Sequence, residues 1–216
     1  MKAKDFKIIR KKLAKLNKVD YDPLPGISCE DALSSMVPKA LDDEVLSVRL
    51  VNARNVTETV FQDLLALFEQ NMGELYRNSS WGLDPSAKAA ELRHDMARYL
   101  LVQTPTNHVA AFMHYRFEYD DDDQPKEVVL YVYEIQVDQR FQRRGLGKAL
   151  MAISEQIAVQ AEVAKVMLTV FTKNHDAMEF YKRLNYEIHS SSPSMHKELA
   201  DYEILSKSIS RPSNSG

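Results

Sequence analysis

The chain has 216 residues, of which 44% are hydrophobic, and Cys29 is its one cysteine. This length suits one domain or a domain with an arm, and a lone cysteine excludes an internal disulfide and is compatible with a reducing compartment. No apolar segment approaches the roughly 18 residues of a membrane span, and the Lys-rich N-terminus lacks the apolar core of a secretory signal. We therefore expect neither membrane insertion nor secretion.

The charge is unevenly distributed along the chain, whose net charge is −3. Residues 1–20 carry eight basic and two acidic side chains, a charge of +6, which leaves −9 on the remainder. Such a basic arm would suit contact with nucleic acid, a ribosome or a nuclear import receptor. The alternative, which we favour for the apolar stripe Ile9, Leu13 and Leu16, is an amphipathic helix that packs on the body.

The first half of the chain is predicted to form an arm, a strand, a helix and a hairpin. Residues 1–43 hold the basic arm and an irregular, Pro-rich connection. Alternating apolar residues in 44–51 predict a strand, and Thr57 is placed to cap a helix with apolar residues at helical spacing. Residues 98–103 and 108–119 flank the turn sequence TPTN, which predicts a β-hairpin.

The second half alternates strands and helices. Residues 127–137 are β-branched and aromatic, as is typical of a strand. A helical stripe follows from about residue 145, and the apolar segment 165–171 is typical of a strand buried on both faces. A second helical stripe, the loop SSSPSM and a last strand YEILSKSI follow, and 210–216 is predicted to be a disordered tail. This order predicts one α/β domain over 44–209, with helices on the faces of a mixed sheet.

The segment QVDQRFQRRGLGKAL places a glycine-arginine corner between a strand and a helix. The first turn of a helix leaves backbone N–H groups unpaired, and together with the helix dipole they attract anions. Gly145 and Gly147 lack a Cβ and let a ligand phosphate approach the backbone, while Arg143 and Arg144 add positive charge. We expect the main-chain amides from Arg143 to Lys148 to hold a pyrophosphate.

The spacing of the corner excludes two common phosphate-binding motifs. A dinucleotide-binding G-x-G-x-x-G fails because position 150 is leucine, and a P-loop fails because Lys148 is followed by Ala149. The pattern Gln142-x-x-Gly145-x-Gly147 after a long strand resembles the acetyl-CoA pyrophosphate loop of the GNAT acetyltransferase superfamily. The downstream NHDAMEFYKRLNYE resembles the second signature of that superfamily. The resemblance implies a mixed sheet of about six to seven strands flanked by helices, with acetyl-CoA as the cofactor.

A narrower resemblance comes from LYRNSSWG, VLYVYEIQV, KVMLTVFTKNH, SSPSM and YEILS, which lie within residues 50–207. Together these segments resemble the D-type N-terminal acetyltransferases (NatD). That resemblance implies acetyl transfer to the N-terminal α-amino group of core histones, types four and two-A, which begin Ser-Gly-Arg-Gly-Lys. Histone tails would then be the partners, and we expect a monomer found in both cytoplasm and nucleus.

Glu134 is the candidate general base, because it interrupts an apolar strand, where a charge is costly without a purpose or partner. A peptide α-amino group has a pKa of about 8, so a partly desolvated carboxylate acting through water is a sufficient base. The alternative is a glutamate on the wet face of the strand. Tyr181 is the candidate proton donor to the departing thiolate, and its alternative is a core tyrosine.

The strand poses a geometric problem, since Tyr131 and Tyr133 share a face and Glu134 alternates to the other. All three reach one site only if the strand bulges or splays there, and the superfamily resemblance implies such a splay. By the same resemblance both tyrosines line the substrate channel and Tyr133 joins the catalytic residues, whereas strand aromatics more usually serve packing.

Resemblance also supplies the expected cofactor contacts. Asn174 contacts the cofactor arm, or caps the helix that follows it, and the two roles are compatible. The full set of expected cofactor residues is Ile135, Gln136, Val137, Gln142, Arg143, Arg144, Gly145, Leu146, Gly147, Lys148, Asn174 and Tyr181.

The acidic segment FEYDDDD is the candidate substrate end. A carboxylate grips a guanidinium through two hydrogen bonds, and by resemblance Glu118 and Asp120 bind the arginine at the third position of the histone tail. The order of the acids is reversed relative to the family and extra aspartates follow, so Asp121 to Asp123 are equally well interpreted as a solvated hairpin tip. The remaining expected substrate contacts are Tyr76, Trp81, Tyr131, Tyr133, Ser191 and Tyr202.

Two other functions compete with this one. The same fold acting on a lysine side chain or a small amine is the first alternative. A histone-tail reader without catalysis is the second, and the intact set of Glu134, Asn174, Tyr181 and the glycine corner argues against it. No Cys, His or Asp cluster has metal-ligand spacing, so we expect no metal.

Overall fold

The computed structural model describes residues 3–18, 21, 46–121 and 125–209. Its centre is a seven-stranded mixed sheet, as the predicted fold class requires, with the strand order β1-β2-β3-β4-β5-β7-β6. The strands are β1 (Ser47–Asn52), β2 (Arg98–Gln103), β3 (Val109–Tyr119), β4 (Val128–Val137), β5 (Lys165–Phe171), β6 (Glu187–Ile188) and β7 (Tyr202–Ser208). The first four strands form an antiparallel meander, and the β4–β5 pair is parallel.

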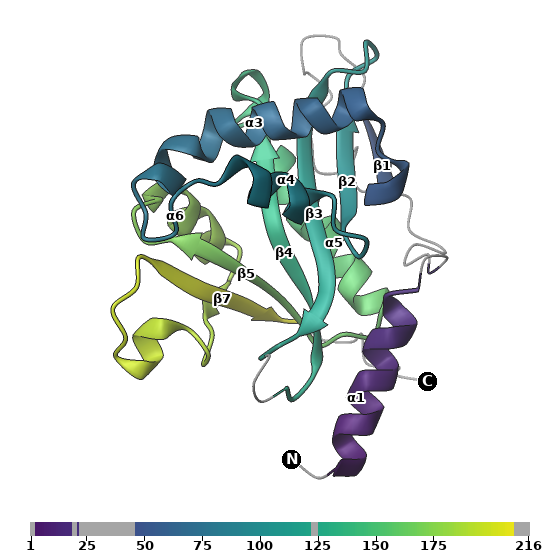
Figure 1. Cartoon of the computed structure of the whole chain (residues 1–216), viewed down its shortest axis with the longest axis vertical. Coiled ribbons are helices and arrows are strands. Elements are labelled where there is room, and N and C mark those ends of the chain that lie inside the picture. Colours follow the sequence, from purple (N-terminus) through teal and green to yellow (C-terminus); the bar gives the residue numbers. More distant parts are fainter. Residues whose placement is uncertain (1–2, 19–20, 22–45, 122–124, 210–216) are drawn as a thin grey trace.

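Helices cover both faces of this sheet, with α3 and α4 in front and α5 behind (Figure 1). Their bounds are α1 (Ala3–Leu16), α3 (Glu58–Arg77), α4 (Pro85–Leu92), α5 (Leu146–Gln160) and α6 (His175–Arg183). One apolar core lies between the sheet and α1, α5 and α6, and a second lies under α3 and α4. In the described part of the chain, 3-10 turns at Ala53–Asn55, Gln139–Phe141 and Pro193–His196 join the elements.

The N-terminal helix α1 packs on the body, as we favoured for its apolar stripe. Leu16 is buried in the core beneath α5, and Ile9 and Leu13 pack against it. The Arg98 guanidinium donates hydrogen bonds to the carbonyls of Leu16 and Lys18 and so closes the C-terminal end of the helix. The predicted irregular connection, apart from residue 21, and the predicted tail lie outside the described residues.

Most predicted elements are present, and the local signals act as expected. The Thr57 side chain caps α3 by accepting from the Val60 N–H, and β2 and β3 form the predicted hairpin. The sequence reading missed α4, although Asp84 caps it and Pro85 occupies its first turn. It also missed β6, whose two residues form no readable pattern.

Strand β4 contains the irregularity that the candidate site requires. On β3, His114 pairs with Glu134 and the next residue, Tyr115, pairs with Val132, so Tyr133 is an extra residue. Leu130 and Val132 face the α5 core, as does Ile135, whereas the Tyr133 and Glu134 side chains contact groups on the α3 and α4 face. This bulge places consecutive side chains on one face.

The sheet also opens beside the bulge. The parallel ladder between β4 and β5 covers only Leu130 to Val132, opposite Val166 to Leu168. Beyond these residues the two strands diverge toward their C-terminal ends (Figure 1). The expectation of a bulge or a splay in this strand is therefore confirmed on both counts.

Candidate active site

A cavity of about 1020 Å³ lies where β4 and β5 part. Its walls include the end of α3, the glycine-arginine corner, the start of α6 and the acidic end of β3. The cavity therefore runs from the corner, past Glu134, to Glu118 and Asp120. One continuous space joins the predicted cofactor end and the predicted substrate end.

The corner has the backbone conformation that its glycines predict. Gly145 has φ +92° and is the N-cap of α5, a left-handed conformation that glycine adopts without strain. Gly147 stands where an added Cβ would come within 3.3 Å of the Phe180 ring, so it also allows α6 to pack closely. The first-turn N–H groups of α5, which begin at Leu146, have no carbonyl within the helix to bind. They suit the pyrophosphate of acetyl-CoA.

Side chains around the corner divide into those that line the cavity and those that do not. Gln142, Arg143 and Lys148 line it, together with the strand residues Ile135, Gln136 and Val137. The exposed Arg143 guanidinium also pairs with Asp176 at 3.0 Å. Arg144 is absent from the cavity wall, so among the expected cofactor residues its side chain has the weakest geometric support.

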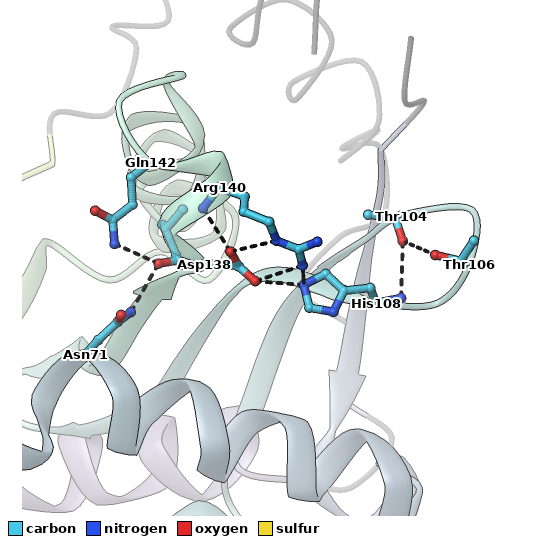
Figure 2. Close-up of polar contacts among 8 residues, drawn as sticks. Asn71, Thr104, Thr106, His108, Asp138, Arg140 and Gln142 are labelled. Carbon is cyan, nitrogen blue, oxygen red and sulfur yellow. Dashed lines mark hydrogen bonds and ion pairs between the residues drawn. The ribbon is translucent and has the colours of Figure 1, made fainter. Parts of the chain in front are cut away.

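The corner is fixed from behind by hydrogen bonds to one carbonyl. Asn71 of α3 and Gln142 both donate side-chain N–H groups to the Val137 carbonyl, at 3.1 and 3.0 Å. Figure 2 shows these two amides converging from opposite sides. The Gln142 amide thus supports the backbone of the corner, a role that the sequence reading did not foresee.

An ion cluster holds the other side of the corner. The Asp138 carboxylate accepts from the Arg140 backbone N–H at 2.9 Å and from its guanidinium, and its other oxygen lies 2.8 Å from His108 Nε2 (Figure 2). Burial raises the pKa of Asp138, but hydrogen bonds from Arg140 and His108 outweigh it and the pKa falls to about 2. Asp138 therefore caps the turn that leads into the corner.

Glu134, the candidate base, is buried in the cavity wall and is 5% exposed. Its Oε1 accepts from Lys88 Nζ at 2.8 Å and lies 3.5 Å from the Tyr76 hydroxyl. Its Oε2 accepts from Gln136 Nε2 at 2.7 Å. Burial raises the pKa of the carboxyl, and the Lys88 ammonium opposes that rise. The alternative of a solvent-facing glutamate is wrong.

Lys88 of α4 is a site residue that the sequence reading missed. It is only 7% exposed and lines the cavity beside Glu134. Burial lowers the pKa of its ammonium, but the facing carboxylates of Glu134 and Glu91 outweigh that effect and raise it. In sequence it is one lysine in a polar segment, and only the packing of α4 places it here.

The two candidate tyrosines of β4 both line the cavity. The Tyr131 hydroxyl bonds to Thr169 across the splay, and the Tyr133 hydroxyl donates to Glu118 at 3.2 Å. The ring of Tyr133 stacks on His114, with centroids 5.0 Å apart. Burial raises the pKa of Tyr133, and the Glu118 carboxylate raises it further, so the hydroxyl stays protonated at neutral pH.

Tyr181 and Asn174 enter the cavity from α6 and its cap. Burial raises the pKa of the Tyr181 hydroxyl, followed by the effect of Glu134, so the group keeps its proton. Within the described residues no hydrogen bond is assigned to that hydroxyl, which leaves it available to a ligand. Asn174 lines the same wall and caps α6 by accepting from the Ala177 N–H, so its capping role is confirmed.

The acidic end of the cavity contains Glu118, Asp120 and Asp121. Asp120 also performs a structural task, because its Oδ1 accepts from the N–H groups of Lys126 and Glu127 at 2.8 and 3.0 Å. These bonds close the β3–β4 connection. The predictions for Asp122 and Asp123 fall outside the described residues.

Of the other expected substrate residues, some line the cavity wall and one packs behind a residue of that wall. Tyr76, Trp81 and Ser191 line the cavity. Tyr202 does not, and instead its ring packs against Trp81, with centroids 5.0 Å apart. Trp81 remains 49% exposed above that contact. Tyr202 therefore supports Trp81 from behind.

Residues 3–18, 21, 46–121 and 125–209 hold neither a group of metal ligands nor a helix that could span a membrane. In that part of the chain, no three His, Cys, Asp or Glu side chains are grouped as ligands for a metal ion. None of its helices is both long and apolar enough to cross a membrane.

Comparison with known proteins identifies the family to which this chain belongs. Residues 61–186 match the acetyltransferase (GNAT) family. Among solved structures, the chain is similar to a GNAT-family acetyltransferase from Staphylococcus aureus Mu50, with a TM-score of 0.57 and 11% identity. That alignment covers 76% of this chain and 100% of the bacterial one.

Two further structures share the fold at similarly low identity. Arabidopsis thaliana NAA60, solved with a bisubstrate analogue, has a TM-score of 0.55 and 14% identity over 77% of this chain and 100% of its own. The ribosomal-protein-S18-alanine N-acetyltransferase of Escherichia coli has a TM-score of 0.51 and 16% identity over 79% of this chain and 99% of its own.

Proposed function

Because the chain belongs to the GNAT family of acetyltransferases, we propose that it acetylates the N-terminal α-amino group of histone tails, types four and two-A, that begin Ser-Gly-Arg-Gly. Acetyl transfer from acetyl-CoA is the activity of the family. The N-terminal amine and the histone substrate are the parts that we add.

The observation that carries the proposal is that the two ends of this one continuous cavity have opposite polarity. One end presents the N–H groups and basic side chains of the corner, and the other presents Glu118, Asp120 and Asp121. Glu134 lies between these ends. A peptide with a free amine and an arginine two residues later matches this order, because its guanidinium would meet carboxylates while its amine lies near the base.

The chain's own groups suit proton transfer at an α-amine. Such an amine has a pKa of about 8, so a sizeable fraction is neutral near pH 7 and little assistance is needed. The Glu134 carboxylate takes the proton that the amine loses, directly or through one water. Tyr181, held protonated by burial, donates a proton to the leaving sulfur.

Acetyl-CoA, when bound, supplies the activated acetyl group as a thioester. The first-turn amides of α5 and the cation of Lys148 would hold its pyrophosphate, and Asn174 would contact its arm. The E. coli structure is named for an N-acetyltransferase of a ribosomal protein, so a protein substrate is compatible with this fold.

The competing proposal is acetylation of a lysine side chain or a small amine in the same cavity. The acidic end attracts any cation, so charge alone does not separate the two. A lysine amine has a pKa of about 10.4, however, and requires more help from the base than an α-amine does.

The test is mass spectrometry of a Ser-Gly-Arg-Gly-Lys peptide incubated with acetyl-CoA and the protein. We expect one acetyl group on the free α-amine and none on a peptide whose α-amine is blocked. Replacing the third residue with alanine should lower kcat/KM by roughly 5- to 150-fold, because carboxylates lose their partner. Equal acetylation of the blocked peptide would refute the N-terminal assignment and favour the lysine alternative.

A further inference from the structure

Lys88 is a buried cation beside the candidate base, and the proposed function assigns it no task. Lysine is rarely buried without a partner, because removing its charge from water is costly. The Nζ atom also lies 4.7 Å from the centre of the Phe68 ring and 4.9 Å from that of Tyr76. The aromatic faces favour the charged ammonium.

All three hydrogen-bond donors of the Lys88 ammonium are in use. They point to Glu134 Oε1 at 2.8 Å, Glu91 Oε1 at 2.7 Å and the Tyr76 hydroxyl at 3.1 Å. An ammonium has three donors, so this set fixes both its position and its rotation. Glu91 lies on the same helix one turn later, which ties the group to α4.

The oxygen of the Glu134 carboxylate that does not face Lys88 is also hydrogen-bonded. Gln136 Nε2 donates to Glu134 Oε2 at 2.7 Å, and the side-chain oxygen Oε1 of Gln136 in turn accepts from Asn71 Nδ2 at 3.1 Å. The carboxylate has about four lone-pair positions, and described residues fill three of them. The position left on Oε2 is available to a water or an amine in the cavity that Glu134 lines.

Other titratable groups near Glu134 do not replace the lysine. They come from six elements and are Tyr76, Glu91, Tyr99, His114, Arg116, Tyr133 and Tyr181. Burial, and after it Arg116 and Lys88, lowers the pKa of His114, which is neutral at pH 7. The Arg116 guanidinium contacts His114, the Glu91 carbonyl and the Tyr133 ring.

We propose that Lys88 is a positioning residue for acetyl transfer, whose ammonium keeps the Glu134 carboxylate ionised and aims its free lone pair into the cavity. This inference rests on the proposed role of Glu134 as base. Without the lysine, a carboxylate buried from water takes up a proton and cannot accept another from the amine. The α4 helix thereby takes part in the chemistry although it holds no acid or base of the reaction.

The direct test follows the protonation of Glu134 by infrared spectroscopy. The carbonyl band of the protonated acid is identified by its loss in Glu134→Gln, and it is titrated in wild-type protein and in Lys88→Met. Because an opposite charge at this distance changes a pKa by about 1 to 3 units, we expect the midpoint in Lys88→Met to rise by that amount. An unchanged midpoint overturns the inference.

Matched variants separate charge from folding. Lys88→Arg keeps the charge and should keep the wild-type midpoint, whereas Lys88→Gln keeps hydrogen-bond donors and should behave like Lys88→Met. If Lys88→Met fails to fold, Lys88→Gln decides the question in its place. Lys207→Met removes a different Lys–Glu pair, that of Lys207 with Glu155 at 2.8 Å, and should leave the band unmoved.

The pH profile of kcat then tests separately whether Lys88 sets the charge of Glu134 and whether Glu134 is the base. We expect the acidic limb in Lys88→Met to move to higher pH together with the infrared midpoint, with partial recovery of activity at alkaline pH. If the infrared midpoint moves while the kcat profile stays in place, Lys88 sets the charge of Glu134 but Glu134 is not the base. That result would refute the proposed mechanism and the positioning role together.

Discussion

The two ends of the cavity are built in different ways. The cofactor end consists mainly of consecutive backbone, residues 142–148, whose N–H groups we propose as the atoms that bind the pyrophosphate. The acceptor end is assembled from side chains on α3, α4, β3, β4 and the loop that holds Ser191. On the proposed function, main-chain atoms recognise the cofactor, and substitutions hardly alter them. Side chains recognise the substrate, and substitutions can replace these one at a time.

The boundary between the two ends is the bulged segment of β4. Ile135, Gln136 and Val137 lead into the corner, while Tyr131 and Tyr133 face the acidic end. Glu134 is the residue at which the two meet. Variants at the boundary should therefore affect catalysis, and variants at either end should affect binding of one substrate only.

The largest effect is expected at the boundary. Glu134→Gln keeps the shape of the side chain but cannot accept the proton, and a general base contributes about 10²- to 10⁴-fold to a rate. We expect kcat to fall by that factor, with little change in either KM, in steady-state assays with acetyl-CoA and the peptide. A change in peptide KM alone would instead place Glu134 in substrate binding.

A smaller effect is expected from replacing one glycine at each end of the cavity with alanine. Gly145 has φ +92° in the corner and Gly82 has φ +66° beside Trp81. Alanine in this conformation costs about 1–2 kcal/mol, or roughly 5- to 30-fold in an equilibrium constant. Because the alanine variant relieves this strain by leaving the left-handed conformation, CoA binding must restore it, and calorimetry should show that Gly145→Ala weakens CoA binding by that factor.

Gly82→Ala is the matched control for that pair. An added Cβ at Gly82 meets no atom within 4 Å, so its effect is confined to backbone strain. We expect CoA affinity to stay at the wild-type value and the peptide KM to rise. Equal weakening of CoA binding by both variants would show that the two ends are coupled through the fold.

The smallest effect is expected at Asp138, in the ion cluster on the other side of the corner. Its lowered pKa, about 2, means that the native state favours the carboxylate. The stabilisation is complete above the unfolded-state pKa of about 4 and is lost as the pH falls from about 4 toward 2. Asp138→Asn should therefore lower Tm near pH 7 and converge with wild type in acid. A Tm difference that is constant with pH would contradict this role.

The cofactor end could be predicted from sequence because its determinants are contiguous. A strand, a Gly-x-Gly corner and a helical stripe follow one another within a single segment, and the structure places the corner as expected. The hairpin and the caps at Thr57 and Asn174 were predictable for the same reason, since each depends on residues a few positions apart.

The acceptor end was less predictable because long-range packing decides it. Lys88 is a polar residue on a short helix, and its burial depends on how α4 docks over Glu134. Tyr202 lies in the segment YEILS, whose resemblance to the NatD family predicted a substrate contact. In the structure its ring packs against Trp81 and does not line the cavity. Asp120 was expected to bind substrate, and its bonds to the β3–β4 connection became visible only with the hairpin in place.

The extra residue in β4 has a consequence for how the gene can change. Side chains alternate with a period of two along a strand, so every residue after Tyr133 is displaced by half a period relative to those before it. A substitution at Tyr133 preserves the number of residues and hence this phase. An in-frame loss of the Tyr133 codon would instead make Val132 and Glu134 neighbours that still face opposite sides, so the strand would become regular and lose only the bulge that puts two consecutive side chains at the site.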